Sequence, residues 1–453
     1  MQQYFSPFAG YQIPAETEVT GKLLGKLLAD YIANKVPRYV QLRKAYEGDY
    51  AILHKDKKDE FKPDKRLVAN YAKEIVDSMT GYFLGNPVRI AGDDDAAVER
   101  LELWGAYNDS DDLDAELSKT CDIYGSALEF MWRDAQAMPR SSCETPMNGF
   151  IIFDDTVAHT VLYAVRFFLD ANRYDDEIDT FRGTLYTPKW EIPFEWATGE
   201  ANLGEAVLHG FPDVPVVEYI NNEERTGLFE GVLSLIDAHN EAISEKANDV
   251  DYYADAYLEI TGALIDNDTL KKLRDSRIIN IAGQEGQAIK IDFLSKPDAD
   301  ATQEHLIDRL EKLIFEMSMV ADMSAENFGT ASGIAIRYRL LAMSNIAIVK
   351  ERKFRRSLSR RWRLVLGYAV GNSGVSSNGW QTIRATFTRN LPNNLLEETQ
   401  IAGNLSGVVS KETQLSTLSV VDNPAREIER MNDEAEEQAA ALAQPRMVEV
   451  GIE

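Results

Sequence analysis

Two amphipathic helical patterns that bracket a short mixed segment constrain the fold of this 453-residue chain most strongly. The first pattern covers residues 229–254 and the second covers residues 301–321. Each repeats apolar side chains at the three- and four-residue spacing of one helix face. Twenty helical residues span about 30 Å, so the segment between the two helices is expected to lie well away from the body of the chain. Such a subunit suits a ring or tube assembly.

The segment between the two helices has the pattern of a small α/β module. We expect strands at residues 257–261, 277–281 and 288–294 and a helix at residues 268–276. It contains little apolar mass for a core of its own, so its stability is expected to depend on neighbouring copies. On the first long helix, His239 falls on the apolar face, and we interpret it as a packed structural side chain.

The first half of the chain predicts helices followed by a strand-rich body. Helical spacing covers residues 21–35, 37–53 and 67–84, and a further helix is expected near residues 94–107. Runs rich in β-branched and aromatic residues then predict an α+β body dominated by antiparallel strands. The clearest of these runs are residues 127–133, 149–153, 161–169 and 181–186.

A very long basic helix is predicted over residues 333–368. From Arg337 to Arg363 it holds ten basic residues and one acid, Glu351, a net charge of +9. These charges either touch DNA or pair with the acidic surface of an adjacent subunit, unless the helix face is merely solvated. We favour the subunit contact, because charge pairs set register and specificity between partners. Beyond it we expect a strand at residues 380–388 and helices at 395–405, 411–418 and 424–441.

The overall charge is strongly negative: 74 acidic residues against 48 basic ones give −26 at pH 7. Such a chain repels phosphates on average, which disfavours tight DNA binding but not a protein past which DNA slides. Cys121 and Cys143 fit neither a disulfide framework nor a zinc motif, so we expect plain buried or half-buried thiols. Residues 1–10 lack the pattern of a signal peptide, and no apolar run is long enough to span a bilayer.

The usual signatures of an enzyme are missing from the sequence. It has no phosphate-binding G-x-x-x-x-G-K-[ST] loop, no G-x-S-x-G elbow and no paired histidines of a metal site. Acidic runs at residues 93–95 and 109–114 are interpreted as solvated loop acids and not as metal ligands. We therefore expect no catalytic residue, no metal site and no cofactor. A nucleic-acid-processing enzyme with a basic DNA helix, or another ring-forming connector or tail protein of a virion, stay as alternatives.

Four stretches, in this order along the chain, resemble the SPP1-like portal proteins of siphoviruses. They are residues 70–87 (Asn-Tyr-Ala-Lys-Glu-Ile-Val-Asp leading to Gly-Tyr-Phe-Leu-Gly-Asn-Pro), residues 215–225 (Pro-Val-Val-Glu-Tyr-Ile-Asn-Asn-Glu-Glu-Arg), residues 332–338 and residues 391–394. The second continues through residues 235–240 and 247–249 to 256–258. Any one stretch arises easily by chance, whereas four in order are a specific signal over nearly the whole chain.

The resemblance implies a multi-domain α+β portal fold. It would divide the chain into N-terminal helices and an α+β wing (residues 1–228), a two-helix stem (229–255 and 300–322) and a small mixed α/β clip (256–299). A tunnel loop (323–333), the long basic helix with a return to the wing (334–394) and a helical crown with a C-terminal tail (395–453) would complete it. Within this family we expect no enzymatic activity.

The resemblance also implies partners and a location. We expect a homo-oligomeric ring of twelve copies at one capsid vertex, through which double-stranded DNA passes non-specifically during packaging and ejection. The clip would dock the packaging terminase and later the head–tail adaptor, and scaffolding and major capsid proteins would contact the ring. The protein would be assembled in the host cytoplasm, become part of the virion and contact no membrane.

Three sets of site residues follow from this division. The tunnel loop would contact DNA through Ser324, Asn327, Phe328, Gly329, Thr330, Ser332 and Gly333. The basic helix would contact a subunit or lie near DNA through Arg337, Arg339, Lys350, Arg352, Lys353, Arg355 and Arg356. The clip would offer a docking surface of Lys271, Lys272, Arg274 and Arg277.

Overall fold

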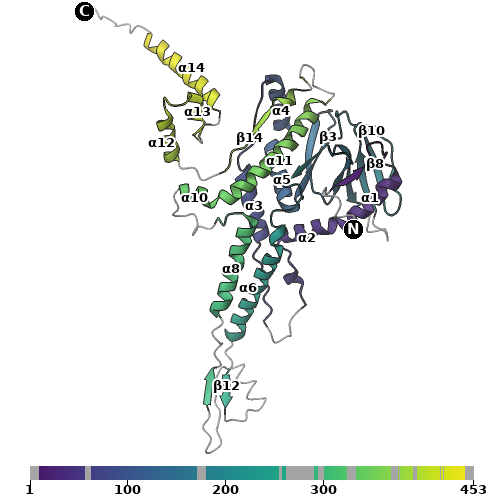
Figure 1. The fold of residues 1–453 in the computed structure, drawn as a ribbon, viewed down its shortest axis with the longest axis vertical. Helices are drawn as coiled ribbons and strands as arrows, with labels where there is room; N and C mark the ends of the chain where they lie inside the picture. Colours follow the sequence, from purple (N-terminus) through teal and green to yellow (C-terminus); the bar gives the residue numbers. More distant parts are fainter. Residues whose placement is uncertain are drawn as a thin grey trace, which may run out of the picture. The chain divides into compact units, whose positions relative to one another are not determined.

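Antiparallel strands dominate the middle of the chain, and the computed structural model arranges them in two sheets beside helices (Figure 1). The larger sheet has the order β1-β5-β6-β7-β8-β10, with β9 paired to β8. Only β1 and β5 run parallel in it. Its strands are β1 (Tyr11–Ile13), β5 (Gly149–Asp154), β6 (Val161–Leu169), β7 (Phe181–Tyr186), β8 (Trp190–Trp196), β9 (Asn202–Leu203) and β10 (Val207–Leu208).

The structure describes most, but not all, of the chain. The described residues are 10–56, 63–170, 180–254, 258–261, 290–293, 300–323, 333–368, 376, 378–390, 395–418, 420–421 and 423–443. They divide into two compact units. The larger comprises Met1–Thr330 and Ile336–Arg389, and the smaller comprises Ala331–Ala335 and Asn390–Glu453.

A second sheet, of three antiparallel strands, lies in the same body. Its order is β11-β3-β4, from β3 (Ser126–Arg133), β4 (Pro139–Glu144) and β11 (Val216–Ile220). Apolar residues of both sheets form one buried cluster, which contains Leu128, Phe130, Ile151, Phe153, Ala164, Tyr186, Val214 and Val216. The expected α+β body is therefore confirmed, and the β6 and β7 bounds match the predicted runs.

Helices surround this body. The N-terminal ones are α1 (Gly21–Asn34), α2 (Val36–Glu47) and α3 (Tyr71–Leu84), followed by α4 (Asp95–Asn108) and α5 (Ser110–Tyr124). α2 ends before residue 53 because Gly48 takes a left-handed conformation, and a short 3-10 helix, η2 (Ala51–His54), follows it. α3 begins at Tyr71 because the Asn70 side chain accepts a hydrogen bond from Lys73 N.

The interpretation of residues 93–95 and 109–114 as solvated loop acids is correct only in part: most of these acids are exposed, but several belong to the ends of helices. The Asp94 carboxylate caps α4 by accepting a hydrogen bond from Ala97 N, and Asp109 separates α4 from α5. The next four residues open α5, where acidic side chains are favourable because the amide groups of a first turn are electropositive. Asp114, one turn further, is buried.

α5 leads into β3 through one glycine. Gly125 ends the helix at φ +85, a conformation that side chains rarely adopt. A Cβ atom added there would lie 2.1 Å from the Arg225 carbonyl oxygen. This close approach lets β11 and the loop after it pack against the end of α5, where Gly125 O accepts a hydrogen bond from Asn221 N.

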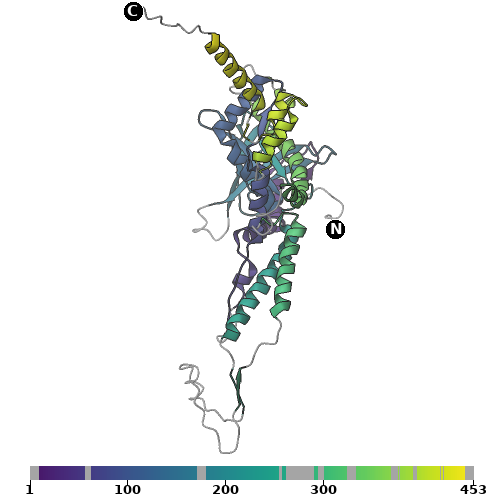
Figure 2. The same ribbon diagram turned by 90° about the vertical axis from the view of Figure 1, so that its left-hand side faces the viewer.

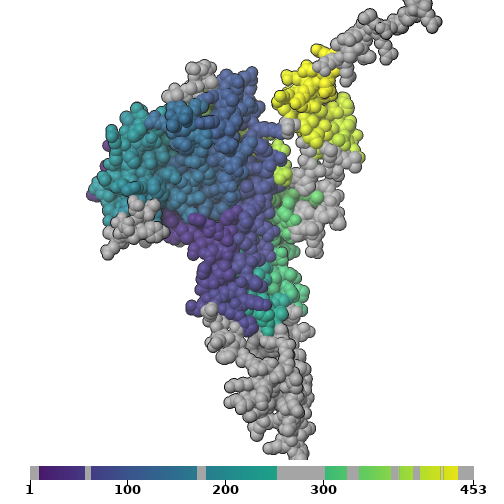
Figure 3. Space-filling view, turned by 180° about the vertical axis from the view of Figure 1, so that it is seen from behind, coloured from purple at the N-terminus to yellow at the C-terminus, as the bar shows by residue number. Residues whose placement is uncertain are grey.

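The two long helices expected at residues 229–254 and 301–321 are present as α6 (Leu233–Ala254) and α8 (Asp300–Ser318). A 3-10 turn, η4 (Glu230–Val232), precedes α6. The two helices run side by side in both views (Figure 1; Figure 2). They are antiparallel, because Gln303 near the start of α8 donates to Asp249 near the end of α6. From behind, the N-terminal helices cover the base of the pair (Figure 3).

The module between the stem helices is described only in two strands. β12 (Leu258–Thr261) and β13 (Lys290–Phe293) pair antiparallel, with Leu258 opposite Phe293. Strands at both positions were expected. The expected helix at residues 268–276 and strand at residues 277–281 lie outside the described residues.

The long basic helix is in two pieces. α10 (Gly333–Arg339) and α11 (Leu341–Leu366) meet at Leu340, which is buried and has ψ near 0°. The expected single helix over 333–368 is therefore divided at Leu340, although the hydrogen bonds from Leu340 N to Ile336 O and from Ser344 N to Leu340 O continue across the division. After α11, a 3-10 turn η5 (Gly379–Gln381) precedes β14 (Arg384–Thr386), which pairs with β2 (Arg89–Ala91).

The smaller unit is helical, as expected. It contains α12 (Leu395–Leu405), α13 (Lys411–Leu415) and α14 (Pro424–Ala443). α13 begins with Ser410, whose side chain accepts a hydrogen bond from Thr413 N. Among its described residues, Ala402 is the buried hydrophobic side chain. Three helices with so small a core need further contacts to be stable.

Candidate functional site

Aromatic side chains join α6 and α8 to α3. Tyr71 of α3 stands edge-on to the His239 ring of α6, at 5.0 Å between centroids, and edge-on to Phe315 of α8, at 5.6 Å. Burial lowers the pKa of His239, so its ring is neutral at pH 7. The interpretation of His239 as a structural side chain is confirmed.

An irregular segment, residues 63–70, lies along one polar stripe of α6. The amide N–H groups of Lys65, Leu67 and Ala69 donate to side-chain oxygens of α6 at 2.6, 2.9 and 2.8 Å. The acceptors recur every fourth residue: Asn248 Oδ1, Ser244 Oγ and Asn240 Oδ1. Four helical residues rise about 6 Å and two extended residues about 6.6 Å, so the two repeats match.

These three acceptors are buried, and two ion pairs flank them. Asn240, Ser244 and Asn248 are each less than one-tenth exposed. Lys65 lies 2.7 Å from Asp251, and Lys55 lies 2.6 Å from Glu241. The segment is thus fixed to α6 along about three helical turns. We name residues 63–70 the strap.

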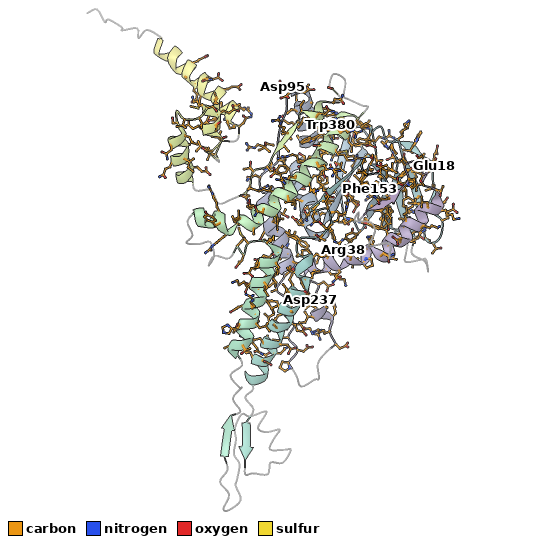
Figure 4. All side chains as sticks on the ribbon, in the orientation of Figure 1. Glu18, Arg38, Asp95, Phe153, Asp237 and Trp380 are labelled. Atoms are coloured by element: carbon orange, nitrogen blue, oxygen red, sulfur yellow. The ribbon has the colours of Figure 1, made fainter. Side chains whose placement is uncertain are left out.

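Two arginines fix the chain just before α6. Arg38 of α2, whose position is labelled in Figure 4, binds both carboxylate oxygens of Glu230 at 2.6 Å and donates to the Arg225 carbonyl. Arg225 in turn binds both oxygens of Glu218 on β11 at 2.7 and 2.8 Å. Bidentate arginine–carboxylate pairs have a fixed geometry, so they orient the chain as it passes from β11 to α6.

Part of the basic helix is internal to its own subunit. Lys350 is 2% exposed, and its Nζ lies 2.5 Å from Asp122 Oδ2 of α5. Burial raises the pKa of Asp122, although the ammonium group of Lys350 opposes this shift. Lys350 therefore neutralises a carboxylate of its own chain. The prediction that it contacts a neighbouring subunit or lies near DNA is wrong, because its side chain is buried.

A second buried network surrounds Arg361. Its Nε lies 2.8 Å from Glu129 on β3, and its Nη1 lies 2.6 Å from Asp114 on α5. The Tyr219 hydroxyl donates to Glu129 at 2.7 Å. Burial raises the pKa of Asp114 to about 6, although Arg361 acts in the opposite direction. Sequence reasoning did not identify this network.

The remaining predicted basic positions lie at or near the surface. Arg337, Arg339, Arg352 and Arg356 are exposed. Lys353 pairs with Glu223, and Arg355 lies 2.6 Å from Glu351 one turn earlier. Of the expected tunnel-loop residues, Gly333 begins α10. Ser324, Asn327, Phe328, Gly329, Thr330 and Ser332 lie outside the described residues, as do Lys271, Lys272, Arg274 and Arg277 of the clip.

The described part of the chain contains both cysteines and residues of the other metal-ligating types. Cys121 is buried and Cys143 half-buried, and both are free thiols, as expected. Within the described ranges no group of three or more His, Cys, Asp or Glu side chains could hold a metal ion. No helix in that part of the chain is long and apolar enough to cross a membrane.

Comparison with known proteins identifies the family. The family model described as phage portal protein, SPP1 Gp6-like, matches residues 26–441. The portal protein of Bacillus phage SPP1 is 24% identical over 408 residues, which cover 84% of this chain and 78% of the relative. The portal protein of Clostridium phage phiCD119 is 22% identical over 364 residues, which cover 76% of this chain and 79% of the relative.

The fold and these matches define a phage portal, a structural component of the virion capsid that serves DNA packaging. The chain belongs to the SPP1 Gp6-like family of phage portal proteins. Proteins of this class form ring oligomers in the capsid and have a structural rather than a catalytic function.

Proposed function

We propose that twelve copies of this chain form a ring at one capsid vertex, through which double-stranded DNA enters and leaves. In this proposal residues 256–299 are the clip, which docks the terminase motor during packaging and the head–tail adaptor afterwards. Residues 323–333 form the tunnel loop that faces DNA. Scaffolding and major capsid proteins contact the ring, which is assembled in the host cytoplasm.

The antiparallel stem is the observation that carries the proposal. α6 leaves the wing at η4, and α8 returns to it, so the ends at Ala254 and Asp300 lie together. An ion pair between Lys246 and Glu304 joins the helices near that end. A segment connected there lies about 30 Å from η4, at the other end of a helix of 22 residues. That position suits a docking platform for other proteins.

The charge of the chain supports transport without tight binding. A ring of subunits that each carry −26 repels phosphates, so DNA is not trapped by neutralising contacts. Arg352 and Arg356 of α11 are exposed, and in this proposal they pair with the acidic surface of an adjacent subunit. Lys271, Lys272, Arg274 and Arg277 are proposed as the clip surface for the motor and the adaptor.

Native mass spectrometry with electron microscopy tests the ring. Twelve copies of a 50.9 kDa chain have a mass of about 610 kDa. We expect this species, with a central channel, in a purified sample. A sample that stays monomeric or dimeric at all protein and salt concentrations contradicts the proposal. Nucleotide hydrolysis by the pure chain would instead favour the enzyme alternative.

Deletion of the clip tests the docking role separately. A chain in which residues 262–289 are replaced by a short glycine–serine linker keeps β12, β13 and both stem helices. We expect rings that no longer retain the terminase in a pull-down. The matched control is removal of residues 444–453, which leaves the clip intact. Equal terminase retention by both variants contradicts the proposed clip.

A further inference from the structure

A groove opens in the larger unit where the stem, the wing and the basic helix meet. Its volume is about 660 Å³, enough for several side chains. One wall is the C-terminal end of α8, another is the loop at residues 221–231, and the third is α11. The residues that matter for its chemistry are Asp122, Asn221, Met317, Met319, Val349 and Lys350.

The groove has an apolar rim and a neutral floor. Met317 is 66% exposed, Met319 51% and Val349 47%. At the floor, Asp122 and Lys350 neutralise each other at 2.5 Å, and the Asn221 amide donates to the Cys121 carbonyl and to Asp122. A phosphate or another anion would find no uncompensated cation there. The groove therefore favours an uncharged segment of protein.

Further apolar side chains are exposed along the outer face of α11. They are Leu341, 54% exposed, and Ile348, 43% exposed, and the polar Asn345 lies between them. The opposite face, which includes Met343, Ala347 and Phe354, is buried against the body. The exposed face of α11 beside the groove thus carries apolar side chains next to Asn345 and ends at Arg352 and Arg356. Methionine and arginine are enriched in protein–protein interfaces, which fits Met317 and Met319 on the rim and the two arginines beside it.

We propose that a second copy of this chain, the adjacent subunit of the ring, docks in this groove. The inference rests on the proposed ring. A closed ring needs two different complementary surfaces on every subunit, and an exposed apolar patch of this kind is uncommon on a protein that stays monomeric. Subunits that each carry −26 approach best where charge is absent. Methionine side chains adapt to an irregular partner surface, which suits this role.

Site-directed photo-cross-linking tests the occupant. Met317→Cys in a Cys143→Ser chain places one exposed thiol on the rim, because Cys121 is buried. The thiol is labelled with benzophenone-maleimide, and assembled rings are irradiated. We expect covalent dimers whose cross-linked peptides come from two copies. The control is Val157→Cys, a 99% exposed position next to the seven-stranded sheet, which should give at least fivefold less dimer.

A charge placed in the groove gives a second test. Val349→Asp is expected to raise the protein concentration at which half the chains are in rings by tenfold or more, while Val157→Asp leaves it unchanged. Circular dichroism checks that both variants are folded. The groove proposal is overturned if Val349→Asp forms rings normally. It is also overturned if the label at position 317 cross-links only to DNA or only within one chain. Absence of rings from the unaltered chain overturns the ring itself.

Discussion

Lys350 and Arg361 show how a charge count misleads at the scale of single residues. Both belong to the run of ten basic residues, yet each is 2% exposed. The signal was present in the sequence, because Lys350, Phe354, Leu358 and Arg361 recur at helical spacing and share one face. Their partners, Asp122 and Asp114, lie on α5 more than two hundred residues earlier. No local pattern of the sequence indicates which acids those are.

Lys350→Met is expected to destabilise the wing strongly. The substitution leaves Asp122 buried without its cation, which costs about 3–5 kcal/mol in known buried pairs. We expect the free energy of unfolding in urea to fall by that amount. Lys350→Met with Asp122→Asn should recover part of the loss, and Arg352→Met, at an exposed position of the same helix, should change little. Equal stability of the single variant and the unaltered chain would contradict this account of the pair.

Asp114 should make stability depend on pH in the acidic range. Its pKa is about 6 in the folded chain, above the usual value of 3.8, because it is buried. The folded state therefore holds this proton more tightly, and the stability that Asp114 contributes is present below about pH 4 and lost as pH rises through 6. The free energy of unfolding is measured from pH 4 to 7 for the unaltered chain and for Asp114→Asn. The stability of the unaltered chain relative to Asp114→Asn should fall as the pH rises. A difference that is constant with pH would contradict it.

At the scale of elements, helices and strands with a strong period were predictable, and their ends were less so. The runs at 161–169 and 181–186 match β6 and β7, because alternation and flanking turn residues define both ends. α5 was missed because its first turn is a cluster of acids, typical of a loop in composition but stabilising at a helix N-terminus. The strap was not predictable, because it has no regular secondary structure and its amide groups donate to side chains that are distant in the sequence.

The end of α8 was placed at residue 321, but the helix stops at Ser318. Met319 has φ +58, a left-handed conformation that is unfavourable for a residue with a side chain. Val320, which follows, is 2% exposed. The sequence from 301 to 328 contains no glycine or proline that would indicate a stop. The helix therefore ends at a residue in an unfavourable conformation, directly before a buried one.

Met319→Gly is expected to stabilise the chain by about 1 kcal/mol, because glycine adopts the left-handed conformation without steric strain. The matched control is Met317→Gly, two residues earlier in the last turn of α8, which should destabilise by about 1 kcal/mol. Thermal unfolding of the two variants measures both signs. A loss of stability in Met319→Gly would show that the side chain contributes more than its backbone strain.

At the scale of the whole molecule, the family and the α+β fold followed from sequence, whereas the roles of the charges did not. Four short stretches in order sufficed for the family, and two of them cover α3 and β11. The net charge of −26 is a sum, and it does not reveal that basic residues of α11 are divided between the interior and the surface. Subunit contacts and the clip surface stay predictions.

Charge reversal on the exposed side of α11 tests the proposed subunit pairing. Arg355→Glu with Arg356→Glu should raise the protein concentration needed for half-assembly by tenfold or more at low salt. The effect should shrink in 1 M salt, where charges are screened within about 3 Å. Arg363→Glu, near the other end of the same helix, is the control. Unchanged assembly in sedimentation velocity would remove the pairing from the interface.

The strap has a mechanical consequence. Its three amide groups are matched to side chains that recur every fourth residue on α6, so turning the helix about its axis, or sliding it by one residue, would misalign all three together. The three hydrogen bonds therefore prevent α6 from rotating or sliding independently of the strap. A torque or axial load on the far end of α6 must then pass to α3 and the wing as one motion, with no independent slip of the helix.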